Sequence, residues 1–228
     1  MENSQLKTIR LRDFFWRASL LKPSSRVLVA GCGSGYEALE LSFGLENAVS
    51  GIDLKADFAP SLRSNPRLTL TQADLRDIPY KAFSFDFVYC YHVLEHIPDY
   101  RKVISELERV LKPRGTLFIG TPNSQRLLAY LNNQRGATLL TRIRWNCSDW
   151  QARLKGRFSN EAGAHAGFSF YRLNQILSSY FPVVKDFTLD YYKLIYPRWA
   201  KFFKILKSCN WHRILFPSVY FICHKEAA

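Results

Sequence analysis

The chain has 228 residues, 47% of them hydrophobic, and it carries a formal net charge of +13. Its length and composition fit one globular domain with a full core, while five scattered cysteines without a C-x-x-C pair argue against a disulfide scaffold or a zinc site. No apolar run reaches the roughly 18 to 20 residues that span a bilayer, and no signal-peptide pattern opens the chain, so we expect a cytoplasmic protein.

Strand and helix patterns alternate through the first half of the chain. The expected elements are, in order, a helix at residues 5–21, a strand at 26–30, a helix at 36–43, a strand at 48–53, a helix at 58–63, strands at 68–71 and 85–91, a helix at 100–111 and a strand at 116–120. Such alternation predicts a parallel sheet with helices on both of its faces.

The second half of the chain departs from this plan. Residues 124–165 form a long basic insertion, after which we expect a helix at 168–180 and two last strands at 183–191 and 214–224. The segment 192–213 between these strands is too long for a hairpin loop. We therefore expect an α/β fold, with a doubly wound, mostly parallel sheet of seven strands and a basic insertion that caps the substrate site.

A basic amphipathic helix is predicted inside the segment 192–213. Its apolar stripe, at the i, i+3, i+4, i+7 spacing of one helix face, consists of Trp199, Phe202, Phe203 and Leu206. Three lysines lie away from that stripe: Lys201, Lys204 and Lys207. Helices of this kind lie on anionic membranes, so residues 196–207 are a candidate for peripheral contact with the inner face of the membrane.

The positive charge is concentrated in the second half of the chain. Residues 1–121 hold 16 Lys and Arg against 14 Asp and Glu, a net of +2, whereas residues 122–213 hold 15 against 4, a net of +11. This asymmetry indicates a surface that meets an anionic partner, such as a phosphate, a nucleic acid or a membrane.

Three glycines follow the first predicted strand and precede a helix: Gly31, Gly33 and Gly35. Glycine allows a tight turn and the close approach of a ligand to the backbone, and the N–H groups that open a helix attract anionic groups. The next strand ends in Asp53, whose carboxylate suits the vicinal hydroxyls of a ribose. The dinucleotide fingerprint G-x-G-x-x-G is not met, because Tyr36 stands where its last glycine would be.

Seven segments form an ordered set of motifs: VLVAGCGSG at 27–35, GIDL at 51–54, QADLRDIPY at 72–80, FDFV at 85–88, HVLEHIPD at 92–99, RVLKP at 109–113 and GTLFIGTPN at 115–123. Together they resemble the class I S-adenosylmethionine-dependent methyltransferases, and most closely the small-molecule branch that includes the ubiquinone-biosynthesis methyltransferases. The resemblance implies a Rossmann-like fold in a single domain over residues 1–228. Its cofactor-binding half would be residues 26–123, and residues 166–228 would complete the sheet.

The same resemblance implies S-adenosylmethionine as the cofactor and gives each matched residue a role. The turn that would pass beneath the methionine part of the cofactor comprises Gly31, Cys32, Gly33 and Gly35. Asp53 would bind the ribose hydroxyls. Asp74 would accept a hydrogen bond from the adenine amino group, with Leu54 and Leu75 packing on the ring. Tyr91, at the end of the fourth strand, would line the pocket near the methionine.

The chain departs from the family at Val29, which stands two residues before the first glycine, where the family usually has an acid. That acid helps to anchor the loop or the amino group of the cofactor. Either the affinity is lower here, or another group takes its place. An alternative that this departure leaves open is a non-catalytic protein that binds S-adenosylmethionine as the partner of another enzyme.

His92, Glu95 and His96 form an H-x-x-E-H pattern after the fourth strand. A zinc peptidase would need both histidines on one helix face, and Pro98 leaves little room for that helix. A divalent cation held by Glu95 and His96 stays open, as does a structural pair joined by hydrogen bonds, and we assign no metal ligand. His92 follows the carboxyl end of a parallel strand, where ligands bind, so it is the candidate general base for an acceptor hydroxyl. Stacking on the substrate and structural hydrogen bonding stay open as its alternative roles.

The acceptor itself is open to three interpretations. A small-molecule or lipid-like acceptor, methylated at oxygen beneath the insertion 124–165, is favoured. RNA or DNA on the basic surface is less favoured, because YHVL at 91–94 replaces the Asn/Asp-Pro-Pro-aromatic motif of many nucleobase methyltransferases. In the third interpretation the charges are only solvated and the aromatic residues cover the sheet.

Overall fold

The computed structural model describes residues 2–127, 138–155, 167–199, 203, 205, 206, 208 and 210–227. Along the chain these residues form α1 (Glu2–Arg17), β1 (Val27–Ala30), α2 (Tyr36–Ser42), β2 (Val49–Asp53), η1 (Pro60–Leu62), β3 (Leu68–Gln72), β4 (Phe85–Tyr91), η2 (Leu94–His96), α3 (Tyr100–Val110), β5 (Leu111–Pro122), α4 (Leu139–Leu154), α5 (Phe170–Ser178), β6 (Val183–Asp186), α6 (Thr188–Ile195), η4 (Pro197–Trp199), α8 (His212–Leu215) and β7 (Ser218–His224).

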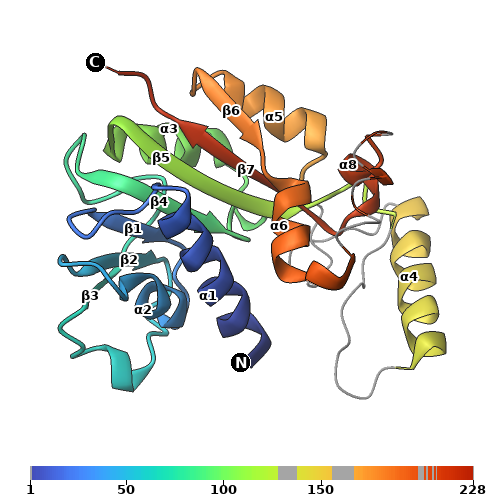
Figure 1. Ribbon diagram of the computed structural model, residues 1–228, viewed down its shortest axis with the longest axis horizontal. Coiled ribbons are helices and arrows are strands. Elements are labelled where there is room, and N and C mark those ends of the chain that lie inside the picture. Colours follow the sequence, from blue (N-terminus) through green and yellow to red (C-terminus); the bar gives the residue numbers. More distant parts are fainter. Residues whose placement is uncertain are drawn as a thin grey trace.

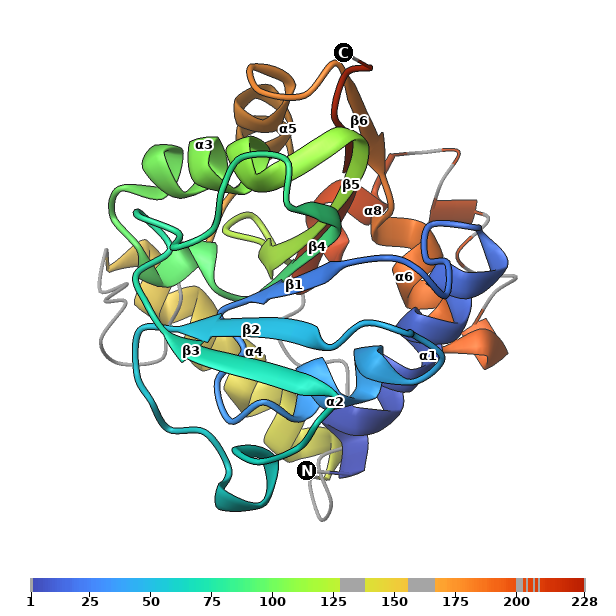
Figure 2. The same ribbon diagram turned by 90° about the vertical axis from the view of Figure 1, so that its left-hand side faces the viewer.

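The strands form one seven-stranded sheet in the order β3-β2-β1-β4-β5-β7-β6 (Figure 1). The first five are parallel, and β7 runs antiparallel to both of its neighbours. Helices α1, α2 and α6 cover one face of the sheet, and α3 and α5 cover the other (Figure 2). This arrangement confirms the predicted α/β fold. Its strand order reverses between β1 and β4, and ligands bind beyond the carboxyl ends of strands at such a point.

Alternate residues of β1 pack on opposite faces of the sheet. Val27 and Val29 belong to the hydrophobic cluster beneath α1 and α2, whereas Leu28 and Ala30 belong to the cluster beneath α3 and α5. A strand that is covered on both faces must be apolar throughout, because successive side chains point to opposite sides. The two clusters hold the carboxyl end of β1 in place where the glycine turn begins.

Two expected elements end earlier than their sequence pattern indicated. The helix at 58–63 is the single turn η1. The strand at 183–191 ends with Asp186, because Asp186 Oδ1 accepts a hydrogen bond from the backbone N–H of Thr188 and the chain turns into α6. Thr188, Tyr191 and Tyr192 are buried on one face of this helix. Their spacing of three and four residues is therefore helical, and the alternation expected of a strand was the wrong interpretation.

The last strand was also predicted too long. It was expected at 214–224, but β7 begins at Ser218 and the residues before it form the short helix α8. Pro217, between them, has no N–H group to donate to a neighbouring strand, which favours a strand that starts after it.

The stripe predicted within 192–213 is divided in the structure. Phe203 and Leu206 are buried in the cluster beneath α1 and α2, where Phe203 packs on Phe216. Trp199, in contrast, ends η4 and is 60% exposed. Part of the stripe thus belongs to the core. Phe202 and the three lysines of this prediction lie outside the described residues.

Helix α4 lies in the basic insertion, beyond the carboxyl end of β5 (Figure 1). Its exposed apolar side chains, at the i, i+3, i+7, i+10 spacing of one face, are Leu140, Ile143, Cys147 and Trp150. An ion pair between Arg126 and Asp149 holds the helix to the end of β5. In the part of the chain that is described, no helix is long and apolar enough to cross a membrane.

Candidate functional site

The glycine turn is held against the end of β2. The N–H groups of Gly31 and Cys32 both donate to the carbonyl oxygen of Ile52, and Gly35 N donates to Cys32 O. The three glycines all have positive φ angles, of 73°, 50° and 93° for Gly31, Gly33 and Gly35. At Gly31 a side chain is also excluded sterically, because a Cβ there would lie 2.2 Å from Cγ2 of Val93. The turn therefore lies directly against the loop that follows β4.

Asp53 joins the glycine turn to the end of β2. Its Oδ2 accepts a hydrogen bond from Gly33 N at 2.8 Å, and its Oδ1 accepts one from Lys55 N at 2.9 Å. A carboxylate has about four lone-pair positions, so two backbone bonds leave acceptor capacity for a further ligand. The side chain is partly exposed. Asp53 can thus orient the turn and accept hydrogen bonds from a diol at the same time.

A cavity of about 560 Å³ opens beside the turn, across the carboxyl ends of β1, β2, β3 and β4. The residues that line it are Gly31, Asp53, Leu54, Lys55, Asp74, Leu75, Arg76, His92, Val93, His96, Ile97 and Pro98. Six of the predicted site residues are among them. Leu54 is 62% exposed at the rim, whereas Leu75 is buried, so a flat ring between them would cover apolar surface that water now meets.

Asp74 has a partner that its sequence motif did not predict. Its Oδ2 accepts a hydrogen bond from Arg76 Nη2 at 2.6 Å, and its Oδ1 accepts from Arg76 N at 2.8 Å. These bonds from Arg76 lower the pKa of the Asp74 carboxyl, which keeps it charged. Arg76 lies only two residues further along the chain, but an exposed arginine near an acid is too common a pattern to have identified the pair.

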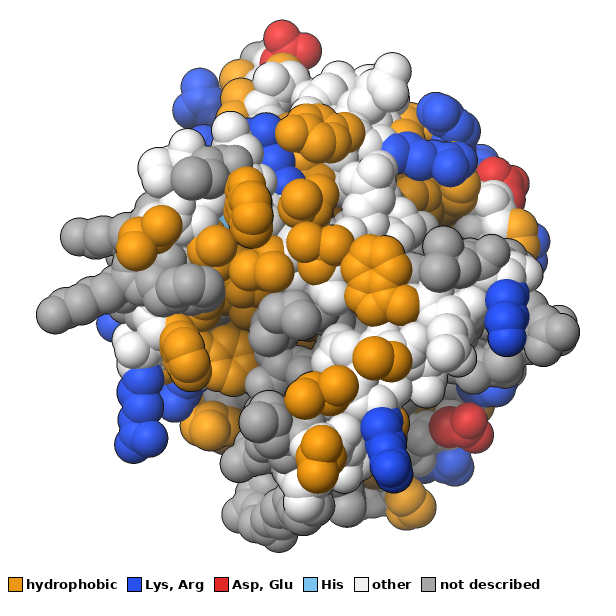
Figure 3. Space-filling view, turned by 90° about the vertical axis from the view of Figure 1, so that its right-hand side faces the viewer, with side chains coloured by type: hydrophobic (Ala, Val, Ile, Leu, Met, Phe, Trp, Pro, Cys, Tyr) orange, Lys and Arg blue, Asp and Glu red, His pale blue; other side chains and the backbone are white. Residues whose placement is uncertain are grey.

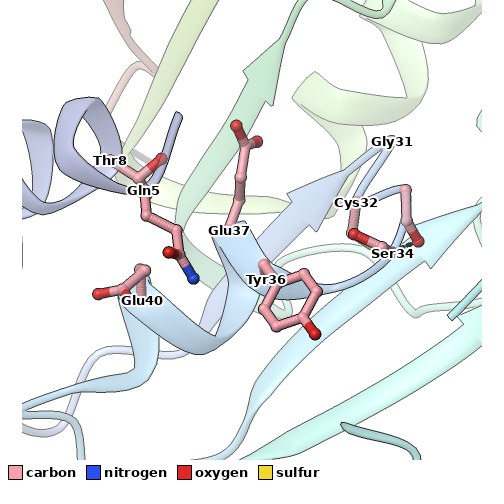
Figure 4. Close-up of a pocket in the computed structure, with 9 residues that line it drawn as sticks. Gln5, Thr8, Gly31, Cys32, Ser34, Tyr36, Glu37 and Glu40 are labelled. Atoms are coloured by element: carbon pink, nitrogen blue, oxygen red, sulfur yellow. Dashed lines mark hydrogen bonds between the residues drawn. The ribbon is translucent and has the colours of Figure 1, made fainter. Parts of the chain in front are cut away.

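A second cavity, of about 270 Å³, lies on the other side of the turn, between the turn and α1 (Figure 4). It is lined by Gln5, Thr8, Gly31, Cys32, Gly33, Ser34, Tyr36, Glu37 and Glu40. Gly31 lines both cavities, so the turn forms the boundary between them. The sequence motifs identified the turn, but not the polar residues that α1 and α2 bring to it.

Tyr91, at the end of β4, lies beneath a cluster of aromatic rings. Its hydroxyl forms a hydrogen bond of 2.8 Å with the hydroxyl of Tyr191 from α6. The ring of Tyr220 stacks on both, with centroids 3.7 Å from Tyr191 and 5.9 Å from Tyr91. Tyr91 lines neither of the two cavities. Its hydroxyl contacts the aromatic cluster.

His92 follows β4 with a positive φ of 55° and lies between two polar groups. Its Nδ1 is 3.6 Å from Oε1 of Glu95, and its Nε2 is 3.4 Å from the hydroxyl of Tyr220. His96 Nε2 is 4.0 Å from the same oxygen of Glu95. The three residues of the H-x-x-E-H pattern therefore meet at Glu95.

The side chain of Glu95 is fully buried, and its Oε2 accepts a hydrogen bond from Thr121 at 3.1 Å. Burial raises the pKa of the Glu95 carboxyl to about 7, although bonds from the backbone and from Thr121 act in the opposite direction. The segment is only the short turn η2, so no helix places His92 and His96 on one face. Among the described residues, no group of three His, Cys, Asp or Glu could hold a metal ion.

Part of this chain is similar to known methyltransferases. Residues 28–119 match the model of a methyltransferase domain family. A probable S-adenosylmethionine-dependent methyltransferase of Mycolicibacterium smegmatis is 36% identical over 98 residues, which are 42% of this chain and 38% of that protein. A ubiquinone biosynthesis O-methyltransferase of Methylococcus capsulatus is 32% identical over 151 residues, or 62% of this chain and 63% of the relative. The chain thus spans less than two thirds of the length of these relatives.

The fold also occurs in solved structures. That of the [4+2]-cyclase SpnF superimposes with a TM-score of 0.61 and 16% sequence identity, over 96% of this chain and 81% of SpnF. A likeness at this identity concerns the fold alone, and the name of this neighbour illustrates that one fold hosts different reactions.

Proposed function

We propose that the protein methylates a hydroxyl oxygen of a small-molecule or lipid-like acceptor, with S-adenosylmethionine as the donor, since residues 28–119 match the model of a methyltransferase domain family. One observation carries the proposal. The glycine turn, Asp53 and Asp74 surround a cavity at the carboxyl ends of adjacent parallel strands. The similarity to a ubiquinone biosynthesis O-methyltransferase supports oxygen as the methylated atom.

The side chains of the site match the parts of the cofactor. Asp53 would accept from the ribose hydroxyls, since its two backbone bonds leave lone pairs unused. The adenine ring would lie between Leu54 and Leu75, and its amino group would donate to Asp74. Arg76 keeps Asp74 charged and oriented, and its hydrogen bonds occupy both carboxylate oxygens, so the adenine amino group would replace one of them. The methionine part would extend past Gly31 into the smaller cavity.

The reaction requires positioning and the removal of one proton. When bound, S-adenosylmethionine supplies a methyl group on a sulfonium, from which it is displaced in line. Holding the acceptor oxygen close to that methyl group supplies much of the rate enhancement. We assign the proton transfer to His92, which lines the larger cavity at the carboxyl end of β4. Glu95, 3.6 Å from Nδ1, would orient the ring and stabilise its protonated form.

His92→Asn tests that assignment. Asparagine tolerates the positive φ of this position but cannot act as a base near neutral pH. We expect kcat to fall by about 10² to 10⁴ with 4-alkylcatechols as acceptors, while the affinity for S-adenosylmethionine stays within about twofold. The loss should shrink at alkaline pH, where the catechol ionises by itself. An unchanged kcat and pH–rate profile would show that His92 takes no part in proton transfer.

A lipid-like acceptor is supported by the surface at the carboxyl ends of the strands. Hydrophobic side chains gather on the face that contains α4 and α8, with Lys and Arg around them (Figure 3). Leu140, Ile143 and Trp150 of α4 and Trp211 next to α8 are among the exposed residues. An apolar helix face within a segment of net charge +11 is typical of a helix that lies on an anionic lipid surface. We therefore transfer the proposed membrane contact from the stripe at 196–207 to α4.

Ile143→Glu tests the lipid proposal, with Ser148→Glu on another side of α4 as its control. The measurement is S-adenosylhomocysteine formation from 4-alkylcatechols of increasing chain length, with phosphatidylglycerol or phosphatidylcholine vesicles. We expect the rate to rise with the chain length of the catechol and with the anionic lipid. Ile143→Glu should lower the activation by anionic vesicles at least about 10-fold, because it places a charge in the apolar contact. Ser148→Glu and turnover of a short, soluble catechol should change little.

Three results would contradict this proposal. Equal loss of vesicle activation in both variants would indicate a general effect of charge and not an apolar contact. Methylation of tRNA but of no catechol would favour the nucleic-acid alternative. Tight S-adenosylmethionine binding without turnover on either substrate would favour the non-catalytic alternative.

A further inference from the structure

The strand that leads into the glycine turn offers the cavities no carboxylate. Val29, where the similar family usually has an acid, is fully buried and packs in the cluster beneath α1 and α2. The methionine part of the proposed cofactor ends in an ammonium and a carboxylate group. A cation that is taken out of water without an anion or acceptor beside it is strongly disfavoured, so a cofactor in this place needs another partner.

Glu37 brings a carboxylate to the smaller cavity from the opposite wall. It lies in the first turn of α2, directly after the glycine turn. Its side chain extends between α1 and the turn that carries Gly31 and Cys32 (Figure 4). Among the described residues, none forms a hydrogen bond or an ion pair with this carboxylate.

Glu40 lines the same cavity one turn further along α2 and differs from Glu37 in its partner. Its carboxylate lies 3.6 Å from the guanidinium of Arg12 in α1. The charge of Glu40 is thus already balanced inside the protein. Of the two carboxylates that line the cavity, Glu37 is the one that can meet the cation of a ligand.

The groups around Glu37 balance its charge only in part. Those that interact with it electrostatically are Lys7 of α1, Cys32 of the turn, Tyr89 and Tyr91 of β4, and Tyr191 of α6. Burial raises the pKa of the thiol and of the phenols, so all four stay neutral. Burial also raises the pKa of Glu37 to about 7, and Lys7 offsets only part of this effect.

We propose that Glu37 accepts hydrogen bonds from the ammonium group of the methionine part of the cofactor, and so replaces from α2 the acid that β1 lacks. The proposal rests on the proposed function, because it places the methionine in the smaller cavity. It makes Glu37 a positioning residue for the donor. It also accounts for how a chain with Val29 can keep the cofactor site of its family.

Two nucleoside probes separate this role from a general effect on the site. S-Adenosylhomocysteine carries the ammonium group, whereas 5′-methylthioadenosine has the same adenosine and thioether but no amino acid part. In calorimetric titrations of the full chain at pH 8, Glu37→Gln should lower the affinity for S-adenosylhomocysteine by about 10- to 100-fold, as expected for the loss of a charge-assisted hydrogen bond. Its affinity for 5′-methylthioadenosine should stay within about twofold, which also shows that the variant is folded. Glu40→Gln should leave both affinities within about threefold.

The pH dependence supplies a second test. Since the ammonium group needs the ionised carboxylate, the wild-type affinity for S-adenosylhomocysteine should fall up to about tenfold per pH unit below pH 7. Glu37→Gln should lose this dependence, and 5′-methylthioadenosine should not show it. Equal S-adenosylhomocysteine affinity in wild type and Glu37→Gln at pH 8 would overturn the role of Glu37 and leave the proposed function intact. Failure of the wild type to bind either probe would instead overturn the proposed function.

Discussion

Asp53→Ala is expected to weaken S-adenosylmethionine binding by about 100-fold or more in calorimetric titration. The variant loses the carboxylate that would accept from the ribose hydroxyls, and hydrogen bonds to charged groups contribute about 1.5–3 kcal/mol each. It also releases the N–H groups of Gly33 and Lys55, which the same carboxylate now holds. The glycine turn would then be less ordered where the ligand meets it.

Asp57→Ala is the matched control for this variant. Asp57 is an exposed acid four residues further along the chain and lies outside the residues that line either cavity. The control separates the position of Asp53 from a general loss of negative charge, and its affinity should stay within about twofold of the wild type. Wild-type affinity in a folded Asp53→Ala protein would contradict both the proposed ribose contact and the proposed cofactor site.

Gly31→Ala is expected to destabilise the protein by about 2–5 kcal/mol and to remove cofactor binding. The positive φ of 73° contributes about 1–2 kcal/mol of strain with any side chain. The new Cβ would also lie 2.2 Å from Val93 Cγ2, and such overpacking costs about 1–3 kcal/mol. Since Gly31 lines both cavities, moving Val93 away would distort the loop that carries His92. Urea unfolding and titration with S-adenosylmethionine measure the two effects.

Gly33→Ala separates the effect of backbone strain from that of the collision with Val93. Gly33 also has a positive φ, of 50°, but a Cβ there would meet nothing within 4 Å. We expect a loss of only about 1–2 kcal/mol at this position. In Gly31→Ala/Val93→Ala the two Cγ atoms that cause the collision are gone, so part of the lost stability should return. Equal destabilisation in Gly31→Ala and Gly33→Ala would mean that contact with Val93 does not constrain the turn.

The sequence by itself determined the parallel half of the fold and the core of the candidate site. Strand β1 is an apolar run buried on both faces, and β2 and β4 are buried along most of their length. All three arise from local sequence patterns and were predicted within a residue or two. The glycine turn and Asp53 follow two adjacent strands of that sheet. Because parallel strands end at the same edge, their spacing along the chain was enough to predict that they meet.

Only the tertiary structure decided which residues from distant segments reach that edge. Glu37 looked like any acid in an amphipathic helix until the packing of α1 against α2 enclosed it beside the turn. The stripe from Trp199 to Leu206 has a helical period, but a period does not say whether its face is covered, and Phe216 covers Phe203. Thr188 to Tyr192 likewise became helix because the bond from Thr188 to Asp186 ended the strand. Periodicity is a local property, whereas burial and electrostatic balance depend on contacts between residues far apart in the chain.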